Sequence, residues 1–154
     1  MVQATHTGGS GNSVVEYSLN SGSTWNDIGG WLSTMTFDAW NRVTGQMNTL
    51  TGDEAIIGFG KLQITGATVN AAYSDGETPA DLLATVWAQH ITTGGGQLML
   101  RCSPQGTASG KRYIQTNTDA KIDSLTPPNI TANSGDPLAI SFHVATSGWD
   151  LGTN

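Results

Sequence analysis

The sequence predicts a mainly β protein, a β-sandwich or open barrel of short antiparallel strands with one flanking α-helix at about residues 79–92. Three observations predict this fold class. Short segments of alternating apolar and polar residues recur along the chain, with turn-rich stretches between them. Glycine occurs 20 times and threonine 21 times in 154 residues, and these residues suit tight turns and pleated strands. Helical spacing of apolar residues occurs in one segment.

The first third of the chain is expected to form an arm, a hairpin, a strand and a loop. Residues 1–13 are mostly small and polar, so we expect a flexible arm in the isolated subunit. Residues 14–28 contain two short strand patterns around a Ser- and Gly-rich turn, which predicts a β-hairpin. A strand follows at residues 32–40. The polar segment at residues 41–53 is interpreted as a long loop, and long loops in compact domains often make contacts.

The middle of the chain contains a change of period from two to about three and a half. Alternation from Lys61 changes phase at Gly66, where we expect a β-bulge. The helix begins at Pro79, with Thr78 as its N-cap, and ends near Thr92 before three glycines. Its apolar stripe is expected to face a sheet. The stripe consists of Leu82, Leu83, Val86, Trp87, His90 and Ile91.

The last third is expected to add three or four strands and a short tail. Strand patterns cover residues 97–103, 112–118, 121–125 and 138–144, and the last of them alternates most clearly. The folded domain is therefore predicted to span residues 14–146. Residues 147–154 are interpreted as a C-terminal tail.

Charge and cysteine content bear on the function classes. Six basic residues against twelve acidic ones give a formal net charge of −6. So few cations argue against a conventional nucleic-acid-binding protein. The single Cys102 cannot form an internal disulfide, which favours an intracellular place of synthesis. The N-terminal residues lack the pattern of a signal peptide, and no segment has the length of a membrane span.

Motifs for catalysis, metals and cofactors are not apparent in the sequence. The three histidines, His6, His90 and His143, lack the close spacing of zinc ligands, so we expect no metal. Residues 106–112 depart from the phosphate-binding loop pattern and are read as a hairpin turn. No nucleophile elbow occurs either. We therefore expect a protein that is not an enzyme and that uses no cofactor.

The sequence also contains one local turn motif and five tryptophans. Residues 18–25 closely resemble the Asp-box of sialidase-like β-propellers, a hairpin device with no catalytic role, here with Asn20 in the Asp position. The tryptophans favour core and interface packing, although they could also stack on sugars in a carbohydrate-binding module. Trp87 is expected in the core, whereas Trp40 and Trp149 are the candidate surface anchors.

The order of these elements resembles the phage major tail tube protein of long-tailed phages. Four features carry the resemblance, and together they cover about residues 14–145: the opening hairpin at 16–25, the strand ending at Tyr73 with an acidic turn into the helix, the segment 96–113, and the ending from Ser124 to Val144. The resemblance implies a β-sandwich with a flanking helix, assembly into six-fold rings, and stacking of the rings into a hollow tube for genome ejection. It also implies kinship in fold with contractile-tail and type VI secretion tubes.

The resemblance also implies binding partners and a location. The partner is the chain itself in stacked hexameric rings, with tape measure, tail terminator and baseplate or tail-tip proteins as further partners. The place is the virion tail, assembled in the host bacterial cytoplasm, and DNA would pass through without specific binding. Six copies at −6 each give a formal charge of −36 per ring, so an acidic lumen would let DNA slide.

The candidate residues fall into two groups, and two alternative functions stay open. The candidate lumen carboxylates are Asp53, Glu54, Asp119 and Asp123, and the candidate ring-stacking residues are Trp40, Arg42, Met47 and Trp149. The alternatives are a carbohydrate-binding β-sandwich module and another virion component, such as a tail terminator or decoration protein.

Overall fold

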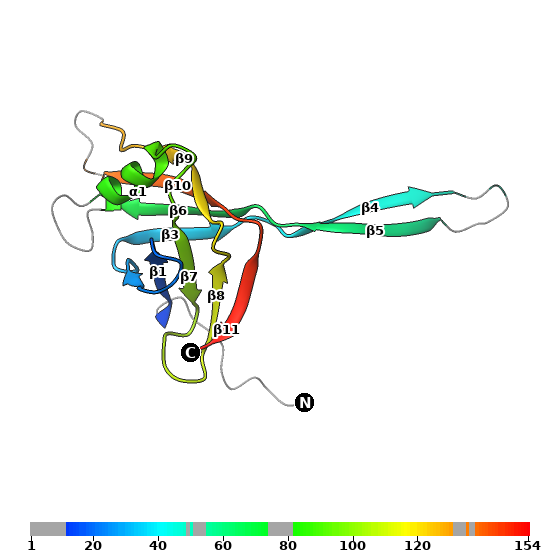
Figure 1. Cartoon of the computed structure of the whole chain (residues 1–154), viewed down its shortest axis with the longest axis horizontal. Coiled ribbons are helices and arrows are strands. Elements are labelled where there is room, and N and C mark those ends of the chain that lie inside the picture. Colours follow the sequence, from blue (N-terminus) through cyan, green and yellow to red (C-terminus); the bar gives the residue numbers. More distant parts are fainter. Residues whose placement is uncertain (1–11, 49, 51–54, 74–81, 131–134, 136–137) are drawn as a thin grey trace.

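The computed structural model describes residues 12–48, 50, 55–73, 82–130, 135 and 138–154. Two sheets form the body, and a separate two-stranded hairpin projects from it (Figure 1). One helix, α1 (Leu82–Ile91), packs beside the body. The mainly β class with one flanking helix is therefore confirmed.

Both body sheets are antiparallel. The five-stranded sheet has the order β11 (Trp149–Thr153), β8 (Arg112–Thr116), β7 (Met99–Ser103), β1 (Val14–Ser18) and β2 (Asn26–Asp27). The four-stranded sheet has the order β3 (Leu32–Phe37), β6 (Gly66–Ala72), β10 (Ala139–Ala145) and β9 (Lys121–Thr126). The hairpin consists of β4 (Asn41–Met47) and β5 (Ile56–Gln63).

The hydrophobic core lies between the two body sheets and is closed at one side by α1. Alternation in β6 and β10 places every second residue on the core face, as period-two patterning predicts. The helix adds Leu82 and Val86, and it lies along β9. The fully buried members with the largest side chains are Phe142, Ile28, Leu98, Leu100, Ile140, Val69, Val86 and Val144.

The Asp-box motif folds as its residues predict. Ser18 Oγ donates to Asn20 Oδ1 over 2.8 Å and accepts from the amide of Gly22 over 3.0 Å. Asn20 Oδ1 in turn accepts from the amide of Thr24 over 2.9 Å. Gly22 has a φ of +81°, a conformation that L side chains rarely adopt, and Trp25 packs against it. The motif thus fixes the turn between β1 and β2.

Two sequence expectations about loops and tails are wrong. The segment predicted as a loop at residues 41–53 contains β4 over its first seven residues. The only large apolar side chains of β4 are Val43 and Met47, so the strand pattern is weak. The predicted tail at residues 147–154 contains β11, which pairs with β8 at the edge of the five-stranded sheet. In the predicted arm, residues 1–11 lie outside the described residues, and Ser13 Oγ donates to the carbonyl of Pro104 over 3.0 Å.

The helix and the expected bulge also need correction. Described helix begins at Leu82, so the predicted start at Pro79 and the cap at Thr78 lie outside the described residues. Trp87 is 48% exposed instead of buried, because α1 uses a narrower face against the body than its apolar stripe suggests. At Gly66 the chain changes from the hairpin to β6, and a φ of +143° there accounts for the change of phase without a bulge.

Candidate functional site

The projecting hairpin is the most unusual surface of the molecule. Figure 1 shows β4 and β5 running away from the body as a narrow ribbon. The strands pair in antiparallel register from Asn41 opposite Gln63 to Met47 opposite Ile56, with an irregularity between Arg42 and Thr44. Every residue of both strands is exposed. The hairpin is therefore a sheet with no layer packed on either face.

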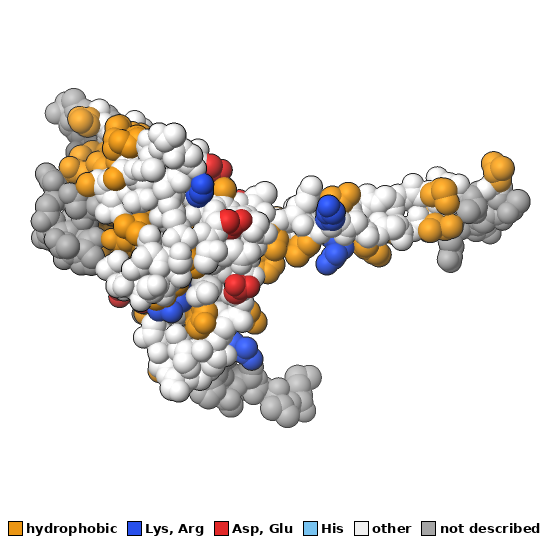
Figure 2. All heavy atoms as spheres, in the orientation of Figure 1, with side chains coloured by type: hydrophobic (Ala, Val, Ile, Leu, Met, Phe, Trp, Pro, Cys, Tyr) orange, Lys and Arg blue, Asp and Glu red, His pale blue; other side chains and the backbone are white. Residues whose placement is uncertain are grey.

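Both faces of the hairpin carry apolar side chains. In the register of the ladder, Phe59 lies opposite Thr44 and Ile57 lies opposite Gln46, which places these aromatic and aliphatic groups on one face. Met47 and Ile56 form a directly opposed pair on the other face. Phe59 is 72% exposed and Met47 is 62% exposed. Figure 2 shows hydrophobic side chains along the projection.

This exposure has an energetic consequence. A two-stranded hairpin in water is marginally stable by itself, because a single ladder provides few contacts to offset the entropy of ordering. Burying one large apolar side chain completely contributes roughly 1.5 to 3 kcal/mol. Six such side chains on the hairpin strands are 45% exposed or more: Val43, Met47, Ile56, Ile57, Phe59 and Leu62. A covering surface would thus stabilise both the hairpin and the complex that it forms.

The hairpin strands also differ from the rest of the chain in charge. Arg42 and Lys61 lie on β4 and β5, and neither strand contains an acidic residue, whereas the whole chain has a formal charge of −6. Arg42 donates through Nη1 to the carbonyl of Gly60 over 3.2 Å, which holds its cation on the ribbon. The two strands of the hairpin are therefore apolar and carry two cations, while Asp53 and Glu54 lie in the sequence between them.

A second exposed apolar surface lies on α1, at the end of the body away from the hairpin (Figures 1 and 2). Trp87 and Ile91 are one helical turn apart and so share a face. They are 48% and 65% exposed. We call this pair the helix patch. The chain thus presents apolar surface at two opposite ends.

The candidate stacking residues fall in three places. Arg42 and Met47 lie on β4, and Trp40 is exposed immediately before that strand. Trp149 instead lies on β11 and packs against the core, with its ring edge-on to Phe37 at a centroid distance of 4.9 Å. The first three are therefore spread along the hairpin from its base to the outer end of β4, whereas Trp149 belongs to the five-stranded sheet and packs beside the end of β3.

The candidate lumen carboxylates do not form one group in the described part of the chain. Asp53 and Glu54 lie outside the described residues. Asp123 lies on β9, where it contacts His143. Asp119 lies in the turn before β9 and accepts hydrogen bonds from the amide of Ser147 and the hydroxyl of Thr146.

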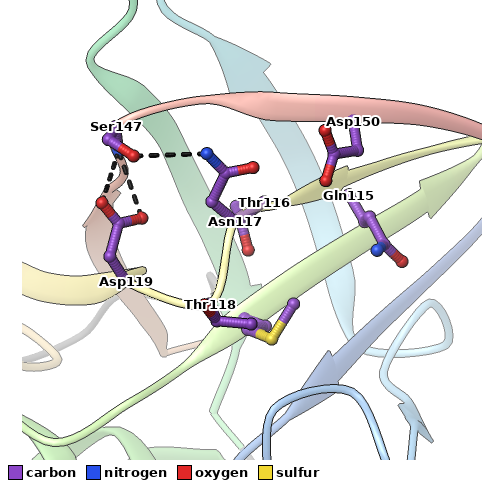
Figure 3. A pocket seen from close by; sticks show the side chains of 8 residues that line it. Gln115, Thr116, Asn117, Thr118, Asp119, Ser147 and Asp150 are labelled. Atoms are coloured by element: carbon purple, nitrogen blue, oxygen red, sulfur yellow. Dashed lines mark hydrogen bonds between the residues drawn. The ribbon is translucent and has the colours of Figure 1, made fainter.

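Asp119 borders a polar hollow of about 310 Å³ between two turns of the body (Figure 3). Ser147 lies between Asp119 and Asn117 and bonds to both. The hydrogen bonds from Ser147, opposed by partial burial, hold the pKa of Asp119 below its ordinary value. These side chains are engaged with one another, which fits a role in joining the turns after β8 and β10.

The described residues contain neither a candidate metal site nor a candidate membrane-spanning helix. No group of three or more His, Cys, Asp or Glu side chains is placed to hold a metal ion within that part of the chain. Among the same residues, no helix has the length and apolar character to cross a membrane.

Sequence reasoning missed the apolar residues of β5. The signal was present in the run Ile56-Ile57-Gly58-Phe59, which is rich in strand-forming residues. It does not alternate, because the hairpin carries apolar groups on both faces.

Comparison with solved structures decides the fold. The anti-feeding prophage cap, a tube terminating cap, is 15% identical with a TM-score of 0.72, and the match covers 100% of this chain and 96% of that one. The PVC sheath/tube terminator of an extracellular contractile injection system is 14% identical with a TM-score of 0.74, covering 98% and 100%.

The SPP1 tail tube is 11% identical with a TM-score of 0.56, covering 93% of this chain and 77% of that one. The chain has the tail tube fold. The resemblance noted from the sequence is confirmed at the level of this fold. Searches against protein-family models and against curated proteins give no match.

Proposed function

We propose that this chain is a structural subunit of a phage-type tail tube, and that its hairpin docks on a second copy of the same chain. The observation that carries the proposal is the projecting hairpin, whose two faces are apolar and exposed on a tail tube fold. A surface of this kind is typical of a protein contact site. The role is structural and involves no catalysis.

A second copy is the occupant that the molecule favours. Arg42 and Lys61 on the strands complement carboxylates on the body of another copy, but Asp53 and Glu54 offset their charge over residues 41–63, so the apolar faces provide most of the attraction. The helix patch offers apolar surface at the opposite end. A contact between two different surfaces of identical chains is heterologous, and it closes into a ring or continues as a filament.

The proposal includes the arrangement of the subunits in the tube. Rings of six stack into a hollow tube in the virion tail, and the excess of carboxylates keeps DNA from binding to the wall. Trp40, Arg42 and Met47 belong to the contact made by the hairpin. Tape measure, terminator and baseplate proteins are its further partners.

Electron microscopy and sedimentation of the purified chain test the proposal. We expect rings or long hollow cylinders at high concentration. An Ile57→Asp variant should remain monomeric, because a carboxylate on the hairpin face would be buried without a partner. Leu19→Asp is the matched control, since Leu19 is an exposed apolar residue on the body, and it should assemble normally. A wild-type chain that stays monomeric at every concentration would contradict the proposal.

A tube terminator is a second candidate, favoured by the full-length likeness to the tube terminating cap. The same images distinguish the two. A terminator forms single rings that do not elongate, whereas a tube subunit stacks into cylinders. A monomer that binds a polysaccharide would instead support a carbohydrate-binding module.

A further inference from the structure

A histidine held between two carboxylates lies at the base of the hairpin. His143 is on β10, where its Nε2 lies 2.7 Å from Asp38 Oδ2 and its Nδ1 lies 2.6 Å from Asp123 Oδ1. The side chain of His143 is 20% exposed, and that of Asp38 is 32% exposed. Both ring nitrogens therefore face an acceptor.

The number of protons determines the charge of this cluster. A neutral imidazole has one N–H, so it can donate to one of the two carboxylates and would turn a lone pair towards the other. The imidazolium form has two donors and satisfies both. Burial lowers the pKa of His143, but the hydrogen bonds to Asp38 and Asp123 outweigh burial and raise it above its ordinary value.

The cluster connects the base of the hairpin to the four-stranded sheet. Asp38 follows β3, and its Oδ2 also accepts from Thr65 Oγ1 over 2.8 Å. Thr65 lies between β5 and β6, so Asp38 joins both stems of the hairpin. The amide of Asp38 donates to the carbonyl of Gly66 over 3.0 Å. His143 then links these stems to β10, and Asp123 extends the link to β9.

We propose that charged His143 is a latch that fixes the hairpin base to the sheet, and that loss of its proton releases the base. After deprotonation the ring keeps a single N–H, so Asp38 and Asp123 compete for one donor and the two links can no longer be made together. The ladder neighbours of His143 are Thr68 on β6 and Ser124 on β9, both uncharged. Asp38 and Asp123 are the charged groups that face the ring from the described elements around it. The latch acts within a single chain and does not depend on the proposed function.

The direction of the pH dependence follows from the two pKa shifts. The pKa of His143 is raised, so the contribution of the latch is complete below the ordinary histidine pKa and is lost as the pH rises through the raised value. The hydrogen bond from His143, opposed by burial, lowers the pKa of Asp38. The acid limit of the link between His143 and Asp38 therefore lies below the ordinary aspartate pKa.

Nuclear magnetic resonance of the monomeric chain tests the latch. We expect the His143 ring nitrogens to titrate with a midpoint above the ordinary histidine pKa. Hydrogen-exchange protection of the Asp38 amide should fall about tenfold as His143 loses its proton, with the same midpoint. His143→Gln should show the lower protection throughout, with no midpoint.

Two variants separate the latch from a general loss of structure. Asp123→Asn removes the carboxylate that competes with Asp38 for the single N–H of a neutral imidazole, so the Asp38 amide should keep its protection through the titration. His90→Gln removes the histidine whose Nδ1 lies 3.4 Å from the Ile122 carbonyl, and it should leave the hairpin base unchanged. A His143 midpoint at or below the ordinary histidine pKa, or unchanged protection of Asp38 across the titration, would overturn the proposal, even if His143→Gln failed to fold.

Discussion

Replacing Phe59 by alanine separates the stability of the chain from the stability of its assembly. Phe59 is 72% exposed, so most of its surface is available to a partner and little is buried in the chain itself. A completely buried Phe contributes up to about 3 kcal/mol. Covering the exposed fraction then contributes about 2 kcal/mol per contact, and the buried fraction contributes about 0.8 kcal/mol to the monomer.

The assay measures two quantities on the Phe59→Ala variant. Pelleting gives the concentration of chain that stays unassembled, which we expect to rise about 30-fold, since 1.4 kcal/mol corresponds to about tenfold. Urea unfolding of the monomer should show a loss of about 0.8 kcal/mol. Thr44→Ala is the control, because Thr44 lies directly opposite Phe59 and offers little apolar area.

Two results would refute this reasoning. One is an unassembled concentration that changes no more in Phe59→Ala than in Thr44→Ala. The other is a monomer that loses as much free energy of unfolding as the assembly does, because Phe59 would then act within the chain.

Three further predictions concern the body. Gly66→Ala should lower the free energy of unfolding, measured by urea denaturation, by more than about 3 kcal/mol. Gly66 has a φ of +143°, and an added Cβ would overlap the carbonyl oxygen of Val144. The control Gly45→Ala, with open space around it, should change the free energy of unfolding by no more than about 0.5 kcal/mol. Ser18→Ala should cost about 1 to 3 kcal/mol in the same assay, since buried Ser18 organises the first turn, whereas exposed Ser33→Ala should change little. Because the pKa of Asp119 is lowered, its contribution to folding stability is present above the ordinary aspartate pKa and is lost as the pH falls through the lowered value. In thermal denaturation, Asp119→Asn should therefore lose less stability in acid than wild type. An equal loss would contradict this role of Asp119.

The parts of the fold that the sequence predicted well are those in which one face of a strand is buried or a turn is determined locally. The alternation around Phe142 marks a strand whose core face packs between the sheets. Ser18 and Gly22 act within a few residues of each other, so their motif carries its own geometry. Neither feature needs knowledge of distant parts of the chain.

The hairpin and the last strand were missed for the opposite reason. β5 begins with apolar residues on both faces and does not alternate, whereas β4 alternates but contains only Val43 and Met47 as large apolar residues. The strand β11 is short and lies at a sheet edge, where pairing with β8 leaves a weak pattern in the sequence. The sequence nevertheless predicts Trp40, Arg42 and Met47 as contact residues, because a segment without a core of its own indicates an external role.

The helix patch and the histidine cluster show two further limits. The stripe on α1 is wider than the face that packs on β9, and helical spacing alone does not reveal which part of a stripe stays uncovered. Asp38, Asp123 and His143 are far apart in the chain and meet through strand register. Register between distant strands is not visible in local patterns.

The hairpin adds no side chain to the hydrophobic core of the described residues. Substitutions in β4 and β5 can therefore change which neighbour is chosen while the sandwich keeps folding as before. In the proposed tube, divergence of this ribbon would be enough to keep the subunits of two tubes in one cell apart. A chimera that carries the ribbon of another tube would exchange its assembly preference and retain its own folded body.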